Sequence, residues 1–295
     1  MILVTGGTGF VGSSLAKELL RDGRSVRCLS RRPERAAGLR EAGCELFRGD
    51  VTSISTVLKA ITPEVEAVVH LVGILNESRG STYRAVHVDG TRNVIDACRG
   101  MGVSRLIHMS ALGARASSGS VYHRTKWEAE ELVRSSGLDY TIFRPSVIFG
   151  RGDHFTTVFA RAMSCLPAVF VPGDGRSRMQ PVSVNDVSRA FAMSLAKKQA
   201  KVKTLDLAGL EALTLDEVID RIGATIGRKR RKVHVPMLLM DINAFLLEKI
   251  LPRPPVSRES LKMLLEDNTT SMNAIVEVFG MVPESLETGM KAYLN

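Results

Sequence analysis

"ILVTGGTGFVGSSLAKELL", residues 2–20, is the stretch of sequence that decides the fold. A short apolar run leads into a glycine-rich turn, and a helical pattern follows the turn. Glycines at such a turn let the backbone approach a pyrophosphate, whose charge is stabilised by the free N–H groups at the helix start. The glycine spacing is GxxGxxG rather than GxGxxG, so the strand–turn–helix context carries the prediction of a dinucleotide site. The predicted cofactor-binding residues of this loop are Gly6, Gly9, Phe10, Val11 and Gly12.

Short β-rich runs alternate with helical segments through the first half of the chain, which predicts a doubly wound parallel Rossmann sheet of the α/β class. We expect a dinucleotide-binding domain over residues 1–150. The rest, 151–295, is expected to be a smaller, mostly helical substrate-binding portion over the carboxyl edge of the sheet. A strand and a helix near 180–208 are expected to return to the Rossmann core. Glycine, proline and charge in 144–153 and 170–181 predict loops, and Thr214 is a predicted helix N-cap.

Composition limits the function classes. The chain has 295 residues, 44% hydrophobic content and a formal charge of +9, which favours an anionic partner such as a phosphorylated cofactor or an acidic lipid surface. The basic run 228–232 lacks interleaved aromatics, so nucleic-acid binding is not expected. Four scattered cysteines without metal-ligand spacing predict a reduced setting and no metal site. We expect a cytoplasmic protein without a leader, with attachment to a membrane surface as the alternative.

The end of the second predicted strand distinguishes the two nicotinamide dinucleotides. An NAD site places an acid there for the ribose, whereas an NADP site supplies arginine for the 2′-phosphate. This chain has Ser30, Arg31 and Arg32 at that place, which favours NADP(H) over NAD(H); the alternative is a solvated surface turn. Weaker positional predictions add cofactor contacts after the third and fourth strands, at Asp50, Val51, Leu71, Val72 and Gly73.

"SVYHRTKWEAEEL", residues 120–132, places Tyr122 one helical turn before Lys126. The pair is either a proton-handling unit or an aromatic ring with a lysine packed beside it. Ser110 closes the strand "RLIHMS" at its carboxyl end, where open α/β sheets hold ligands. A cation beside a tyrosine favours the phenolate and lowers the tyrosine pKa, so we expect Lys126 to act on Tyr122 in this way.

The motifs "TGGTGFVG", Ser110, "YHRTK", "RPSVIFGRGD" and "QPVSVNDVSRA" occur in this order along the chain. In this order they resemble the extended or atypical branch of the short-chain dehydrogenase/reductase superfamily, which includes epimerase/dehydratase-like proteins. "SALGA", "YHRTKWEAE" and the tail 251–268 are similar to bacterial relatives of the nucleotide-binding accessory subunit of respiratory complex I.

The resemblance implies roles for individual residues. Ser110, Tyr122 and Lys126 would be catalytic: the serine binds the substrate carbonyl, and the lysine also binds the nicotinamide ribose. Pro145 and Ile148 match the segment that contacts the nicotinamide.

The chain departs from the pattern of the branch at one position. His87 stands in "HVDGT" where many extended members carry a proton-relaying Asn, and it is either a substitute relay or a structural residue. Asp186 also matches a family landmark, and we expect it to be a helix N-cap.

Three functions follow from these observations. The first is an NADP(H)-dependent oxidoreductase acting on a small carbonyl, lipid-like or quinone-related substrate. The second is a non-catalytic NADPH-binding accessory or assembly protein, with a respiratory complex as its partner. The third is a sugar-nucleotide epimerase or dehydratase, for which Arg151, Arg176 and Arg178 would bind a second diphosphate.

The segment 228–254 combines five consecutive cations with apolar residues at helical spacing. The apolar stripe consists of Leu239, Ile242, Leu246, Leu247 and Ile250. One interpretation is that this stripe covers the substrate cleft inside the protein, and it is the one we favour from the sequence. The other is that the helix lies on an anionic membrane.

Overall fold

The computed structural model describes residues 1–78, 80–251 and 256–294, and its centre is a seven-stranded sheet. The strand order is β11-β6-β5-β4-β1-β2-β3, and every neighbouring pair is parallel. The strands are β1 (Ile2–Thr5), β2 (Val26–Ser30), β3 (Glu45–Arg48), β4 (Ala67–His70), β5 (Arg105–Met109), β6 (Asp139–Pro145) and β11 (Lys203–Leu207). The order reverses between β1 and β4, so the carboxyl ends of these two strands flank the switch point where such folds bind ligands. The predicted doubly wound Rossmann sheet is confirmed.

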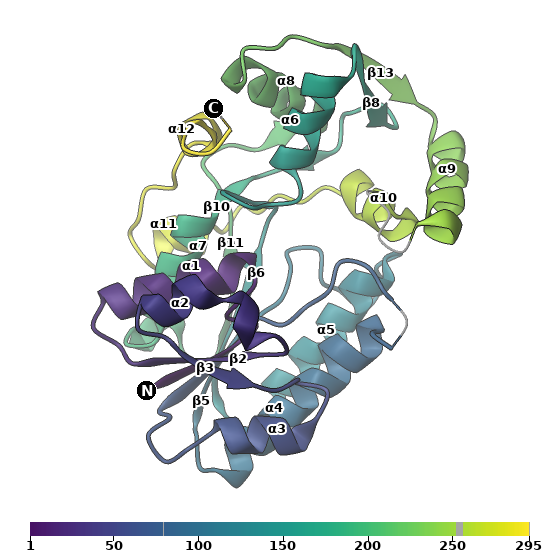
Figure 1. Ribbon diagram of the computed structural model, residues 1–295. Helices are drawn as coiled ribbons and strands as arrows, with labels where there is room; N and C mark the ends of the chain where they lie inside the picture. Colours follow the sequence, from purple (N-terminus) through teal and green to yellow (C-terminus); the bar gives the residue numbers. More distant parts are fainter. Residues whose placement is uncertain (79, 252–255, 295) are drawn as a thin grey trace.

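Helices cover both faces of the sheet (Figure 1). One face carries α1 (Phe10–Arg21), α2 (Ala37–Glu41) and α7 (Val184–Ser194); the other carries α3 (Ile54–Ala60), α4 (Gly90–Gly100) and α5 (Val121–Arg134). A short π-helix, Arg84–Asp89, precedes α4 and was not predicted from the sequence.

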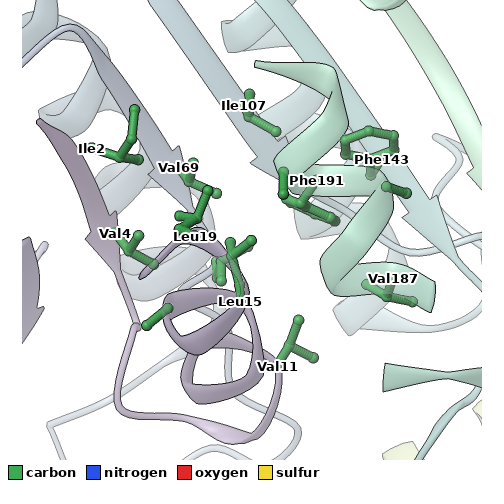
Figure 2. Packing of buried hydrophobic residues seen from close by; sticks show 14 of the residues in the cluster. Ile2, Val4, Val11, Leu15, Leu19, Val69, Ile107, Phe143, Val187 and Phe191 are labelled. Carbon is green, nitrogen blue, oxygen red and sulfur yellow. The ribbon is translucent and has the colours of Figure 1, made fainter. Parts of the chain in front are cut away.

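The α1 face shows why these residues form these elements. Leu15 and Leu19 of α1 point at β1, where Ile2 and Val4 face them, and Phe191 of α7 completes the cluster (Figure 2). All five side chains are at most 1% exposed. Burying a side chain of this size contributes roughly 1.5–3 kcal/mol, so this cluster fixes the first helix, and with it the glycine turn, against the sheet.

A second lobe lies over the carboxyl edge of the sheet (Figure 1). Its helices are α6 (Thr156–Cys165), α8 (Leu215–Thr225), α9 (Met237–Ile250), α10 (Arg258–Leu265) and α12 (Leu286–Lys291), while α11 (Ala274–Glu277) packs on β11. Three two-stranded sheets join them: β7 (Ile148–Phe149) with β10 (Val182–Ser183), β9 (Arg178–Met179) with β12 (Leu213–Thr214), and β8 (Ala168–Pro172) with β13 (Arg231–Val235). The division of the chain at residue 150 stays a prediction. The helix and strand expected near 180–208, α7 and β11, do return to the Rossmann core.

Some local expectations need correction. Strand β9 lies in 170–181, which was expected to be a loop, and the second half of β8 enters the same segment. Strand β13 begins inside the basic run 228–232. The N-cap of α7 is Ser183 rather than Asp186, whose carboxylate accepts a hydrogen bond from the Glu284 N–H at 2.7 Å. Thr214 does cap α8, in a capping box with Glu217.

The expectation that the apolar stripe of α9 faces the protein interior is wrong. Leu239, Ile242, Leu246 and Ile250 are 49–73% exposed, Leu247 is half-buried, and the residue of α9 that is fully buried is Ala244. The helix therefore turns its apolar stripe to solvent.

Candidate functional site

A cavity of about 1220 Å³ is lined by every residue that the sequence predicted to be catalytic or cofactor-binding. It opens at the carboxyl ends of the strands and continues under the second lobe. The predicted residues that line it are Gly6, Gly9, Phe10, Val11, Gly12, Ser30, Arg31, Arg32, Asp50, Val51, Leu71, Val72, Gly73, Ser110, Tyr122, Lys126, Pro145 and Ile148. Segments far apart in sequence thus meet because parallel strands end at one edge.

The glycine turn forms one end of the cavity. Gly6 has φ +75°, a left-handed conformation that favours glycine, and a Cβ on Gly12 would lie 2.2 Å from the Gly6 carbonyl oxygen. Gly9 is the N-cap of α1 and no side chain caps the helix. The first N–H groups of α1 are therefore open to an anion, as a pyrophosphate site requires.

The end of β2 is positively charged. Arg31, Arg32 and Arg35 are exposed, line the cavity and form no ion pair within the described part of the chain. Ser30 is buried with its hydroxyl 3.1 Å from that of Thr8, which joins the end of β2 to the glycine turn. The sequence did not single out Thr8 and Arg35, although Arg35 belongs to the same basic segment as the two predicted arginines.

The loops after β3 and β4 line the cavity between the charged end and the catalytic candidates. Asp50 directs Oδ1 to the Thr52 N–H at 3.0 Å, so this carboxylate is used within its own turn. Gly73 lies against Lys126, because a Cβ there would be 3.2 Å from Nζ. A larger residue at Gly73 would displace the lysine.

Ser110, which follows β5, and Lys126 of α5 are both buried. Each is 2% exposed, and the Lys126 ammonium donates to the Met109 carbonyl oxygen at 2.8 Å. The Ser110 hydroxyl has no hydrogen-bond partner within the described part of the chain. Since buried polar groups are rarely left unpaired, this orphaned hydroxyl fits a group that binds a ligand oxygen. Burial lowers the pKa of Lys126 to about 8, although the Glu130 carboxylate acts in the opposite direction.

Tyr122 lies in an aromatic cage. Its ring contacts Tyr83, His87 and His123 edge-on, with centroids 5.3–6.0 Å away. Burial raises the pKa of Tyr122 to about 12, so the expected lowering by Lys126 is wrong for the structure described here. Tyr122 keeps its proton at neutral pH and is suited to donate it.

His87 has a structural role. Its Nε2 accepts from the Ile74 N–H at 3.0 Å, so the other nitrogen carries the ring proton and donates to the Thr125 hydroxyl at 2.9 Å. Burial, with the Lys126 charge as a smaller cause, lowers the His87 pKa to about 2. The ring stays neutral and ties the loop after β4 to α5, which decides against a titrating relay.

Two carboxylates from the C-terminal tail hold the start of α5. Glu259 accepts from the Ser120 hydroxyl at 2.5 Å and from the Tyr122 N–H at 2.9 Å. Glu266 lies 3.0 Å from Arg115. Negative charge at a helix N-terminus is stabilising. The sequence did not reveal this contact, because 137 residues separate Glu259 from Tyr122.

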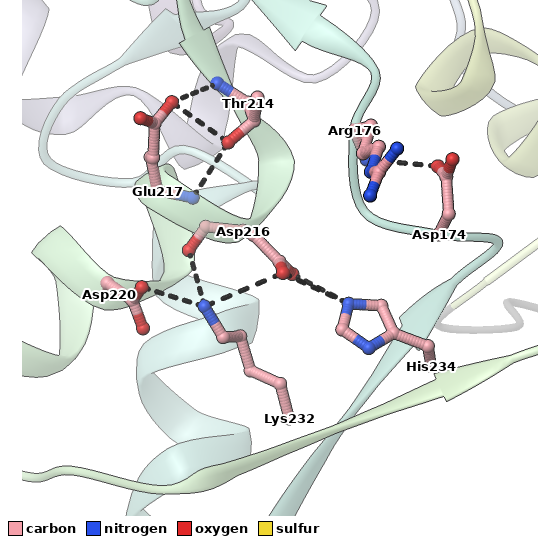
Figure 3. A network of polar contacts seen from close by, with 8 residues as sticks. All are labelled: Asp174, Arg176, Thr214, Asp216, Glu217, Asp220, Lys232 and His234. Carbon is pink, nitrogen blue, oxygen red and sulfur yellow. Dashed lines mark hydrogen bonds and ion pairs between the residues drawn. The ribbon is translucent and has the colours of Figure 1, made fainter.

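The far end of the cavity is apolar. Phe155, Val158, Phe159, Leu166, Val169, Phe170, Met179, Met240, Met263 and Leu264 line it. The three arginines expected to bind a second diphosphate, Arg151, Arg176 and Arg178, lie outside this lining. Arg176 instead borders a separate open hollow, beside the network of Asp216, Lys232 and His234 (Figure 3).

The glycine turn, the open helix terminus, the arginines that follow β2 and the orphaned Ser110 hydroxyl fit a dinucleotide with its nicotinamide near Ser110. Within the described residues, no three His, Cys, Asp or Glu side chains gather as a metal site. Fold and site together define the chain as an NAD(P)-binding Rossmann protein.

The comparisons with known proteins make this assignment more specific. A model of the NAD dependent epimerase/dehydratase family matches residues 2–208. The chain belongs to this family.

The 2-alkyl-3-oxoalkanoate reductase of Stenotrophomonas maltophilia is 28% identical, over 98% of this chain and 97% of its own. The mitochondrial NADH-ubiquinone oxidoreductase 40 kDa subunit of Neurospora crassa is 25% identical, over 92% of this chain and 72% of its own. Among solved structures, a Thermus thermophilus UDP-glucose 4-epimerase in complex with NAD has a TM-score of 0.75 at 23% identity, with 99% of this chain and 97% of that chain covered. At that identity the structural likeness supports the fold alone.

Proposed function

We propose that the protein is an NADP(H)-dependent reductase that converts an apolar, lipid-like carbonyl compound to an alcohol. The observation that carries the proposal is the buried, unpaired Ser110 hydroxyl between a basic dinucleotide end and an apolar far end of one cavity. A reductase from Stenotrophomonas maltophilia that matches nearly the whole chain is named for a 2-alkyl-3-oxoalkanoate, which supports a substrate with alkyl chains.

The residues of the chain have distinct tasks in this reaction. Ser110 donates a hydrogen bond to the substrate carbonyl oxygen, and Tyr122 gives that oxygen its proton. A dinucleotide held by the glycine turn, with its nicotinamide near Ser110, would supply the hydride to the carbonyl carbon. Lys126 provides positive charge beside the cofactor ribose and the reacting oxygen. A Tyr122 pKa of about 12 leaves the residue protonated at neutral pH, which is the state that a proton donor needs.

The apolar lining also supports this proposal over sugar-nucleotide chemistry. A second diphosphate needs cations at the substrate end, and within the described residues the cationic side chains of the cavity are Lys126 and the arginines near β2. Arg151, which lies three residues after the predicted nicotinamide contact Ile148, donates to the Ala292 carbonyl oxygen instead. We therefore set the epimerase or dehydratase alternative aside.

A second function, tight NADPH binding without turnover, is favoured by one observation. Lys126 is held by the Met109 carbonyl oxygen and the Tyr122 pKa is raised, so the pair is not activated as the resemblance implied. The match to a subunit of a respiratory NADH-ubiquinone oxidoreductase supports the same role, with a respiratory complex as partner.

NADPH oxidation in the presence of medium-chain 3-oxo esters tests the proposal. We expect turnover that falls by roughly 100-fold or more in Tyr122→Phe, the range that a general acid typically contributes. Ser110→Ala should also lose turnover while its stability stays within about 1 kcal/mol of wild type, because the hydroxyl has no partner to lose. Co-purified NADPH with no turnover on any carbonyl would instead establish the binding role.

A further inference from the structure

The solvent-facing side of α9 is apolar, which reverses the usual arrangement of a helix in a soluble domain. Its exposed apolar residues are Leu238, Leu239, Ile242, Phe245, Leu246 and Ile250, each 45–74% exposed. At 3.6 residues per turn these six positions fall within an arc of about 140°. Ala244 on the opposite side is 1% exposed and faces the protein. Six large apolar side chains of α9 are thus on the side that the protein leaves uncovered, while Met237, Met240 and Leu247 are half-buried.

The charges of α9 are arranged around this arc. The two acidic residues, Asp241 and Glu248, lie outside the arc and both accept hydrogen bonds from Arg258, at 2.9 and 2.8 Å. Lys249 lies within the arc, with Nζ 5.6 Å from the Phe245 ring centroid. A lysine among exposed apolar side chains can extend its ammonium to the polar boundary of a membrane. The apolar surface therefore carries positive charge and no free carboxylate.

The basic run before α9 adds unpaired cations to the same edge of the second lobe (Figure 1). Arg228, Lys229 and Arg231 are exposed and form no ion pair within the described part of the chain. Lys232 is not available, because it contacts Asp220 at 2.7 Å and Asp216 at 3.7 Å (Figure 3). Arg231 is the first residue of β13, and this five-residue strand, about 16 Å long at 3.3 Å per residue, leads from the cations to α9.

Strand β8, which pairs with β13, and helix α9 both contribute side chains to the apolar end of the cavity. Phe170 of β8 pairs in register with Val233 of β13, is 57% exposed and lines the cavity. Met240 of α9 lines it from the other side. An occupant of the α9 face would therefore lie directly beside the apolar end of the cavity.

We propose that α9 lies flat on an anionic lipid surface, with Arg228, Lys229 and Arg231 on the headgroups. A wide apolar arc in the plane of the interface, together with nearby cations, is the pattern of an interfacial helix. The net charge of +9 acts in the same direction. Within the described residues no helix is long and apolar enough to cross a bilayer, so the attachment is a surface one. Docking in this way would bring the elements that line the apolar end of the cavity, α9 and β8, close to the membrane.

Co-sedimentation with phosphatidylcholine vesicles, with and without phosphatidylglycerol, tests the proposal on the full chain. We expect binding that requires phosphatidylglycerol and falls as salt is raised. R228Q/K229Q/R231Q should weaken it roughly 100-fold, from a factor of about five per cation. The matched control K17Q/R40Q/K59Q removes three exposed cations of the Rossmann domain that form no ion pair within the described residues. It should bind more tightly than R228Q/K229Q/R231Q by at least tenfold, on the order of the effect of two cations.

A second variant set tests the apolar arc. L238Q/I242Q/L246Q should lose roughly tenfold or more in vesicle affinity, while I54Q/L58Q, which changes exposed apolar residues on α3, should bind as wild type does. The changed side chains are exposed, so thermal unfolding should be close to wild type in both sets.

Absence of binding to acidic vesicles at low salt would overturn the proposal. Equal binding to neutral vesicles would overturn the anionic surface. A self-associated form that L238Q/I242Q/L246Q disperses, with no vesicle binding, would assign the face to a second copy of the chain. The readout is independent of turnover, so it stands whether or not the reductase proposal holds.

Discussion

Lys126 is held where its charge is disfavoured, because it is 2% exposed and burial brings its pKa to about 8. An unfolded lysine has a pKa near 10.4, so between about pH 8 and 10.4 the unfolded chain binds one more proton than the folded one. The folded form therefore gains stability from this residue as pH rises through that window. Below about pH 8 both forms hold the proton and the folded state bears the full cost of the buried charge.

Comparison of wild type with Lys126→Met isolates this effect. The free energy of unfolding of the variant should exceed that of wild type by more at pH 7 than at about pH 9.5, since only wild type relieves its buried charge. Urea denaturation at the two pH values measures the difference. An unchanged gap between the two proteins would mean that Lys126 titrates as an ordinary exposed lysine.

We expect the arginines at the end of β2 to carry a preference for NADPH. Arg31 lines the cavity without an ion pair in the described residues, and we expect Arg31→Gln to weaken NADPH binding by roughly 1.5–3 kcal/mol through a lost contact with the 2′-phosphate. NADH affinity should barely change. Arg48→Gln is the control, because Arg48 pairs with Glu34 at 2.9 Å and does not line the cavity. Isothermal titration with both dinucleotides decides, and tighter binding of NADH by wild type would contradict the assignment.

At the scale of elements, a buried ion cluster sets the position of α5, the helix that carries Tyr122 and Lys126. Glu130 is fully buried and accepts two hydrogen bonds from Arg144 of β6, at 2.7 and 2.6 Å. Removing one partner of such a pair leaves an uncompensated charge, so Glu130→Gln should lower the free energy of unfolding by about 3 kcal/mol. Glu128→Gln, two residues earlier in an exposed pair with Arg84, should cost less than about 1 kcal/mol. Chemical denaturation compares the two, and equal losses would show that the cluster does not fix the helix.

The elements also show what the sequence could predict. Strands with strong apolar patterns and a helix with the Thr214 capping box were predictable, because their signals are local. Strand β13 was not, since it begins with Arg231 and Lys232 and is formed by pairing with β8, 63 residues earlier in its register. The site residues of the Rossmann half were predictable from their places at strand ends. The contact of Glu259 with the Tyr122 N–H depends on how the tail folds back, which no local pattern indicates.

At the scale of the whole molecule, the two lobes contribute different parts of the cavity. The Rossmann half supplies the glycine turn and the three polar residues Ser110, Tyr122 and Lys126. The second lobe closes the cavity with an apolar wall and anchors α5 through Glu259. The proposed chemistry needs both, because hydride transfer requires the substrate carbonyl to be held against the nicotinamide with water largely excluded.

The most direct test of the account follows the hydride. The protein is incubated with NADPH that carries deuterium on the transferred face of the nicotinamide and with a medium-chain 3-oxo ester, and the product is analysed by mass spectrometry. We predict a hydroxy ester with a single deuterium on the former carbonyl carbon, formed by wild type and strongly reduced with Tyr122→Phe. Product without deuterium, or equal labelling with Tyr122→Phe, would contradict the account.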